Sequence, residues 1–264
     1  MAPVDWIDVS NLPLTSLLLL ERIQWSWFPA WVSEHNLGIA LREHPIVAQV
    51  ARAKCPEISE WLDRLMREAP KLDNPASVRE AEEAMMRQIN DLLVYVLDPA
   101  LYDAQPFLGW DSSELSSLAD FAGKTVLDIG AGTGRLTLVA APAATAVFAV
   151  EPVENLRRYL SQKARDAGHT NVYPVDGLAT DIPFPNGFAD ITMGGRVFGD
   201  HPNDEIREVL GVTKPGGLVI ACPGNGDTDN KTHQAFVDHG FDWSRFEEPQ
   251  DGTKRKYWKT VSAN

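Results

Sequence analysis

The chain has 264 residues, of which 44% are hydrophobic and 23% are charged. This length fits one large domain, or a core domain with a smaller one attached. The formal net charge of −13 would repel a phosphate backbone, so it argues against a nucleic-acid substrate.

The two cysteines, Cys55 and Cys222, lie far apart in the sequence and have no metal-ligand spacing, so we expect reduced thiols and no metal site. Residues 1–5 lack the basic segment that opens a signal peptide, and the apolar run at residues 17–20 is far too short to span a bilayer. We therefore expect a cytoplasmic protein without a membrane partner.

Residues 1–105 are predicted to be helical throughout, because they almost entirely lack glycine turns. Helices are expected after Pro45 and after Pro56, since proline favours the first helical position. A longer helix is expected to begin at the capping residue Asn74 and to end before Pro99. Apolar residues recur there every three or four positions over about five turns.

From residue 124 onward, strands are expected to alternate with helices, which predicts a parallel sheet. The end of the chain differs, because residues 241–246 and 256–261 flank a turn at Asp251 and Gly252, as in a β-hairpin. The basic residues of its second strand are interpreted as the solvated side of that strand: Lys254, Arg255, Lys256 and Lys259.

The most informative segment, residues 125–135, has the pattern of a strand, a glycine turn and a helix start. Gly130, Gly132 and Gly134 stand at alternate positions after the apolar strand. Glycine permits a tight turn and the close approach of a ligand, so the segment predicts a nucleotide-binding turn. Arg135 stands where a dinucleotide fingerprint needs its third glycine, and no Walker lysine follows, which excludes a P-loop.

Two acidic residues narrow the class of ligand. Asp128 lies two residues before the first glycine, where a carboxylate would repel a pyrophosphate but suits a ligand with an ammonium and a sulfonium group. Glu151 closes the next apolar run, at residues 146–150, where an acid can accept hydrogen bonds from both hydroxyls of a ribose.

These features resemble motif I of the class I S-adenosylmethionine (SAM)-dependent methyltransferases. Three further segments match the same family in order: residues 176–178, residues 188–193 and residues 209–220. The resemblance implies a seven-stranded, mostly parallel Rossmann-like sheet that ends in an antiparallel hairpin, preceded here by the helical region. It also implies SAM as the methyl donor and S-adenosylhomocysteine (SAH) as the product.

The resemblance further implies the residues that contact the cofactor: Asp128, Gly130, Ala131, Gly132, Thr133, Gly134, Glu151, Pro152, Asp176, Gly177, Leu178, Gly194 and Trp110. Asp128 is expected near the ammonium group of SAM, and Trp110 over its methionine part. Asp176 is expected to accept the adenine amino group, with Asp181 as a competing candidate.

In this family the loop after the fourth strand, here residues 194–201, faces the transferred methyl group. The Asp/Asn/Ser-Pro-Pro-aromatic signature of the amino-methylating nucleic-acid enzymes is absent, which further disfavours DNA. Asp200 and His201 could deprotonate an acceptor. The alternative is a helix-capping aspartate beside a surface histidine.

The resemblance leads us to expect a SAM-binding methyltransferase domain at residues 106–264 and a substrate lid at residues 1–105. Residues 25–31 hold four large aromatics, which either attract a cationic ligand or form the hydrophobic seam between the helices and the sheet. The expected function is methyl transfer to a small-molecule acceptor, by a monomer or homodimer. The alternatives are a protein side-chain methyltransferase and a non-catalytic SAM-binding protein.

Overall fold

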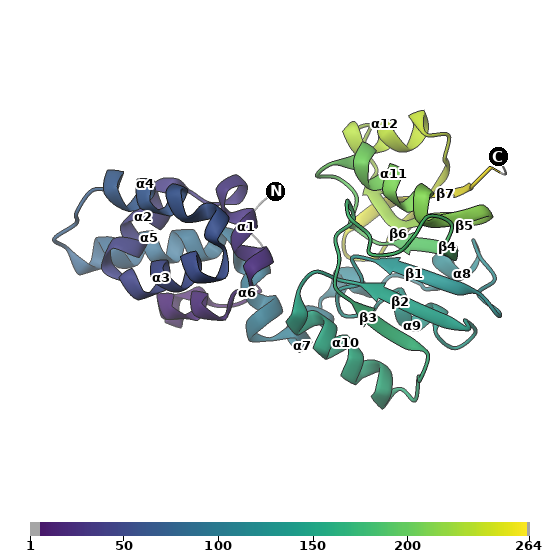
Figure 1. Cartoon of the computed structure of the whole chain (residues 1–264), viewed down its shortest axis with the longest axis horizontal. Helices are drawn as coiled ribbons and strands as arrows, with labels where there is room; N and C mark the ends of the chain where they lie inside the picture. The colour runs from purple at the N-terminus through teal and green to yellow at the C-terminus, as the bar shows by residue number, and fades with distance from the viewer. Residues whose placement is uncertain (1–5, 263–264) are drawn as a thin grey trace. The chain divides into compact units, whose positions relative to one another are not determined.

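A computed structural model describes residues 6–262 of the chain, which divide into two compact units at Tyr102 and Asp103 (Figure 1). Residues 1–5, where we expect no targeting signal, lie outside the described part. Within residues 6–262, no helix has both the length and the apolar character needed to cross a bilayer.

The described part of the N-terminal unit is built from helices, as predicted. They are η1 (Val9–Asn11), η2 (Leu14–Leu19), α1 (Arg22–Trp31), α2 (Glu34–Glu43), α3 (Pro45–Lys54), η3 (Pro56–Ile58), α4 (Ser59–Glu68), α5 (Pro75–Gln88), α6 (Asn90–Leu97) and α7 (Pro99–Asp103), which crosses into the second unit. The helices expected after Pro45 and after Pro56 are confirmed.

The prediction of a single long helix between Asn74 and Pro99 is wrong, because the helix is interrupted between α5 and α6. Ile89 leaves helical geometry, with φ −113° and ψ 23°. The next residue, Asn90, is buried, and its side-chain amide accepts from and donates to the backbone of Ile7 at 3.0 and 2.8 Å. The apolar period continues through the break because both helices face the same core.

The aromatic segment at residues 25–31 divides between the interior and the surface of the helical unit. Trp25 and Phe28 are fully buried in its core, whereas Trp31 is 42% exposed and stacks on Trp27 at 5.7 Å between ring centroids. The buried pair therefore supports the fold of this unit, and a role of the segment toward a ligand stays a prediction.

The C-terminal unit contains a seven-stranded sheet with the strand order β3-β2-β1-β4-β5-β7-β6. Strands β1 to β5 run parallel, and β7 is antiparallel to both of its neighbours, β5 and β6. The predicted fold class is confirmed. The strands are β1 (Thr125–Ile129), β2 (Ala146–Val150), β3 (Val172–Val175), β4 (Ala189–Gly194), β5 (Thr213–Gly226), β6 (Asp242–Glu248) and β7 (Gly252–Thr260).

Helices pack on both faces of this sheet (Figure 1). The helices of this unit are η4 (Pro106–Leu108), α8 (Ser113–Ser116), α9 (Thr137–Ala140), α10 (Glu154–Asp166), α11 (Pro202–Val212) and α12 (Lys231–Asp238), and α8 to α12 are labelled in the figure. Successive residues of β1 point to opposite faces, so Val126 joins a core with α8 and α9 while Leu127 joins a core with α11 and α12.

The interpretation of the basic hairpin residues as a solvated side is wrong for Lys254, Arg255 and Lys256, while Lys259 is half-buried. Lys254, Arg255 and Lys256 are at most 9% exposed, because β7 is an inner strand whose two faces are both covered. Each is paired: Lys254 with Asp251 at 3.0 Å, Arg255 with acids after β5, and Lys256 with Glu114 at 2.6 Å.

Candidate cofactor and acceptor site

The glycine loop follows β1 and requires glycine for two separate reasons. Gly130, Gly132 and Gly134 have φ values of 64°, 53° and 88°, the left-handed region that other residues rarely adopt. A Cβ atom at Gly130 would also lie 2.6 Å from Val197, in the loop after β4. The two loops therefore touch, and Ala131 and Thr133 complete a turn in which Gly134 N–H donates to the Ala131 carbonyl at 2.8 Å.

Asp128, at the end of β1, is buried behind this loop. Its Oδ2 accepts a hydrogen bond from the Thr137 hydroxyl at 2.5 Å, whereas its Oδ1 is buried with no partner among the described residues. Burial raises the pKa of Asp128 to about 7. A buried carboxylate with an unused oxygen suits a nearby cation, so the residue fits the ammonium group that the cofactor would bring.

Glu151, after β2, ties its strand to the glycine loop. Its Oε2 accepts from the Gly132 N–H at 2.9 Å, and its Oε1 accepts from the Val153 N–H at 2.9 Å, across the turn at Pro152. The side chain is only 6% exposed and is thus held in one orientation. A fixed carboxylate beside the glycine loop is what recognition of a ribose needs.

The turn after β3 holds the predicted adenine residues. A Cβ atom at Gly177 would lie 2.8 Å from Val150, and Leu178 forms an isolated antiparallel bridge with Asp181. Asp176 is 75% exposed and pairs at 2.9 Å with Arg157 of α10, to which no pattern in the sequence pointed. The structure therefore brings the ends of β1, β2 and β3 together at one edge of the sheet.

Asp200 and His201 lie exposed at the start of α11. Among the described residues, neither side chain has a hydrogen bond or an ion pair. The cap of α11 comes from Glu205, which accepts from the N–H groups of Gly199 and His201 at 2.8 and 2.9 Å. Asp200 is therefore not the capping residue, and a role of the Asp200–His201 pair in deprotonation stays a prediction.

The loop after β4 contains a second feature that the sequence did not reveal. Arg196 has φ 59°, and its Nη2 pairs with Glu248 at 2.5 Å and with Asp251 at 2.8 Å. Its guanidinium also lies 4.9 Å above the ring of Phe107. The Glu248 side chain is fully buried, and burial raises its pKa. This loop begins at Gly194, so the group borders the edge at which the cofactor residues meet.

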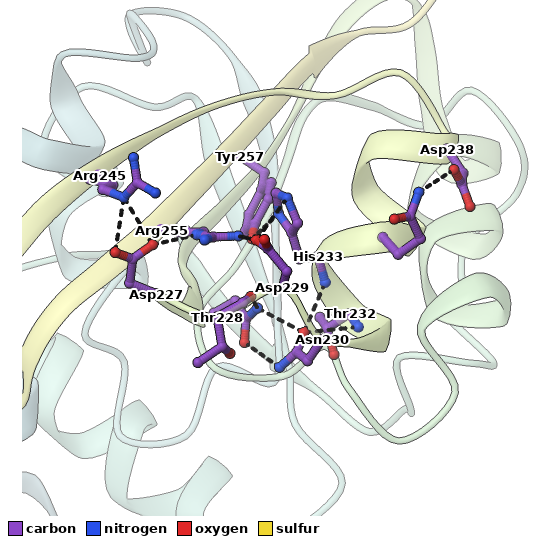
Figure 2. Close-up of polar contacts among 12 residues, drawn as sticks. Asp227, Thr228, Asp229, Asn230, Thr232, His233, Asp238, Arg245, Arg255 and Tyr257 are labelled. Atoms are coloured by element: carbon purple, nitrogen blue, oxygen red, sulfur yellow. Dashed lines mark hydrogen bonds and ion pairs between the residues drawn. The ribbon is translucent and has the colours of Figure 1, made fainter.

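The loop after β5 is fixed against the hairpin by charged and polar contacts, which Figure 2 shows. Asp227 accepts from Arg245 at 2.9 Å and from Arg255 at 2.7 Å, and Arg255 also reaches Asp229 at 2.7 Å. Asn230 accepts from two N–H groups at the start of α12. The loop is thus held in place before any ligand binds.

Trp110 lies inside the core that faces α8 and α9. It is 1% exposed, and the guanidinium of Arg135 lies 4.7 Å from its ring centroid. Its predicted contact with the methionine part of the cofactor stays a prediction.

Cys55 and Cys222 are both free and buried. Across residues 6–262, no group of three or more His, Cys, Asp and Glu side chains is arranged to hold a metal ion.

Comparison with known proteins gives a consistent result. Residues 126–217 match a family model described as a methyltransferase domain. A demethylmenaquinone methyltransferase of Clavibacter sepedonicus is 32% identical over 116 residues, which cover 43% of this chain and 46% of that protein. An uncharacterized methyltransferase of Geobacillus kaustophilus is 28% identical over 170 residues, covering 61% of this chain and 74% of that protein.

The similarity to a solved structure bears only on the fold. A chain from the complex of the Haloferax volcanii Trm112 methyltransferase activator superposes with a TM-score of 0.53 at 14% identity, covering 64% of this chain and 95% of that one. The chain spans about half the length of the first curated relatives that it matches, 46% and 50%. The sheet order, the glycine loop and the sequence match together support a class I SAM-dependent methyltransferase domain at residues 126–217.

Proposed function

We propose that the chain transfers a methyl group from SAM to a small-molecule acceptor. The observation that carries this proposal is the hydrogen bond from the Gly132 N–H to the Glu151 carboxylate. It joins the glycine loop, which would contact the methionine part of SAM, to the acid that would bind the ribose. The glycines let the backbone of the loop approach the ligand closely, and Asp128 supplies the buried negative charge. All of these residues lie in the C-terminal unit.

When bound, SAM supplies the activated methyl group and the sulfonium leaving group. The residues of the chain then have to align the acceptor with the methyl carbon and exclude water. Glu151 orients the ribose, and Asp128 holds the ammonium end. The loop that contains Arg196 and Val197 borders the glycine loop, so we place the acceptor beside it.

The relatives named as demethylmenaquinone methyltransferases direct the choice of acceptor toward a quinone-type ring. The net charge of −13 favours a neutral or cationic acceptor over a polyanion. We further propose that residues 1–105 act as the lid over this acceptor.

A transfer assay with methyl-tritiated SAM tests the proposal. The acceptors are reduced demethylmenaquinone, a panel of phenols and amines, and a mixture of unmethylated proteins. We expect the label in a solvent-extractable small molecule, and less of it with Glu151→Ala. Label in protein would favour the side-chain methyltransferase instead. SAH binding without any transfer would favour the non-catalytic SAM-binding protein.

A further inference from the structure

Two neighbouring strands end at the nucleoside half of the proposed SAM site. Val150 of β2 is in register with Val175 of β3, so the residues that follow them, Glu151 and Asp176, stand at the same level of the sheet. The Glu151 N–H donates to the Val175 carbonyl at 3.0 Å, which extends the pairing beyond the strands.

Arg157 joins these two strand ends from the first turn of α10. Its Nη1 donates to the Glu151 carbonyl oxygen at 2.6 Å and to Asp176 Oδ1 at 2.9 Å. The Arg157 side chain is 19% exposed, whereas that of Asp176 is 75% exposed. The guanidinium therefore sits against the backbone and reaches outward to hold the carboxylate.

An ion pair this exposed adds little to the stability of the fold, because water screens it. Its effect is on geometry, since an exposed aspartate otherwise samples several rotamers and would lose that freedom when a ligand binds. In the described part of the chain, Asp176 Oδ2 has no partner. The pair thus leaves one oxygen of a fixed carboxylate available beside Glu151.

We propose that Arg157 is a positioning residue for the nucleoside half of the cofactor, holding Asp176 so that its free oxygen accepts the 6-amino group of adenine. This inference rests on the proposed function. An ionised carboxylate only accepts hydrogen bonds, so it binds the amino group of adenine and repels the 6-oxo group of hypoxanthine. Arg157 would thereby set the preference for an adenine nucleoside.

The competing acid, Asp181, has no comparable support. Its backbone pairs with Leu178, at 3.1 Å from the Asp181 nitrogen to the Leu178 oxygen. Its carboxylate, however, has no hydrogen bond or ion pair within residues 6–262. An unrestrained side chain is less suited to select one base over another.

Calorimetric titration with SAH and with its deaminated analogue S-inosylhomocysteine tests the inference on the full chain. The variants are Arg157→Ala, Asp176→Asn and Asp181→Asn. Arg158→Ala is the matched control, because Arg158 is the next residue of α10, is 75% exposed and pairs with the exposed Glu154 at 3.8 Å. Thermal melting confirms that each variant is folded.

We expect the wild type to prefer SAH, and Arg157→Ala to bind SAH about tenfold more weakly with a reduced preference for it over the analogue. Asp176→Asn should also relax the preference, because an amide can donate as well as accept. Arg158→Ala and Asp181→Asn should behave as the wild type.

Three results would overturn the inference alone: SAH binding by Arg157→Ala that equals the wild type, an equal loss for both ligands, or a preference altered by Asp181→Asn and not by Asp176→Asn. If the wild type failed to bind SAH, the proposed function would fall, and the inference with it.

Discussion

Asp128 is a single residue whose burial costs stability, because a carboxyl group in the interior of the protein is hard to ionise. Its carboxyl is fully buried, and burial moves its pKa from the ordinary value of 3.8 to about 7. Between these two values the folded protein binds a proton that the unfolded chain has released. The free energy of unfolding therefore falls as the pH rises from 3.8 to about 7.

Asp128→Asn should remove this part of the pH dependence, because an amide of similar shape does not titrate. We expect the variant to gain stability relative to the wild type as the pH is raised from about 5 to about 8. Urea unfolding at several pH values measures the effect.

Asp120→Asn is the matched control, since Asp120 is exposed in the same unit and its bond to the Ala122 N–H can be kept by an asparagine. Parallel stability curves for the wild type and Asp128→Asn would contradict the account of the buried charge.

The glycine loop is the element on which both the fold and the site depend. Gly130 has a left-handed backbone and also touches Val197 of the next loop. Gly123 has a similar φ of 71°, but nothing lies within 4 Å of the place where its Cβ would be. Replacing each glycine by alanine therefore separates two losses of stability. At Gly123 only the left-handed backbone is strained, whereas at Gly130 the new Cβ atom also clashes with Val197.

Gly130→Ala should destabilise the protein by more than Gly123→Ala, which should cost about 1 kcal/mol from the backbone alone. Only Gly130→Ala should weaken SAH binding, since only that loop faces the proposed cofactor. Chemical denaturation and calorimetry measure the two effects. Equal losses of stability and unchanged SAH binding in both variants would contradict the assignment of the loop.

The elements that can be predicted from the sequence are those whose signals are local. The glycine turn, Asp128 and Glu151 lie within one strand-turn-helix-strand unit, and the hairpin turn shows at Gly252. The pair Arg196–Glu248 spans 52 positions and exists only because β4 and β6 end at the same edge of the sheet. No pattern of spacing could reveal it.

The break of the predicted long helix has the same cause. The apolar period from α5 to α6 is continuous, but the stop at Ile89 accompanies a contact between Asn90 and Ile7, 83 positions away. Burial of the basic residues of β7 likewise follows from its inner place in the sheet, which the order of strands in the sequence does not give.

In the whole molecule, the two compact units have different proposed roles: the C-terminal unit binds the cofactor, and the helical unit acts as the lid. Every residue proposed to contact the cofactor lies in the C-terminal unit, and the helical unit has its own core around Trp25 and Phe28. Binding of the methyl donor should therefore be separable, by experiment, from transfer of the methyl group to the acceptor.

A chain that begins at Pro99, so that α7 stays whole, should bind SAH with the affinity of the full chain but transfer methyl groups poorly. The reason is that the proposed lid is removed while the cofactor residues remain. Calorimetry and the tritium assay measure the two activities on the same preparation. A folded truncated chain that transfers methyl groups as fast as the full chain would contradict the proposal that residues 1–105 form a lid.

Titration of the full chain with SAH and with NAD, in the wild type and in Glu151→Ala, tests directly whether the glycine loop and Glu151 bind SAM. We expect that SAH binds, that NAD does not, and that Glu151→Ala weakens SAH binding by about 1–3 kcal/mol, because buried polar groups lose their partner. Binding of NAD without binding of SAH would contradict this expectation.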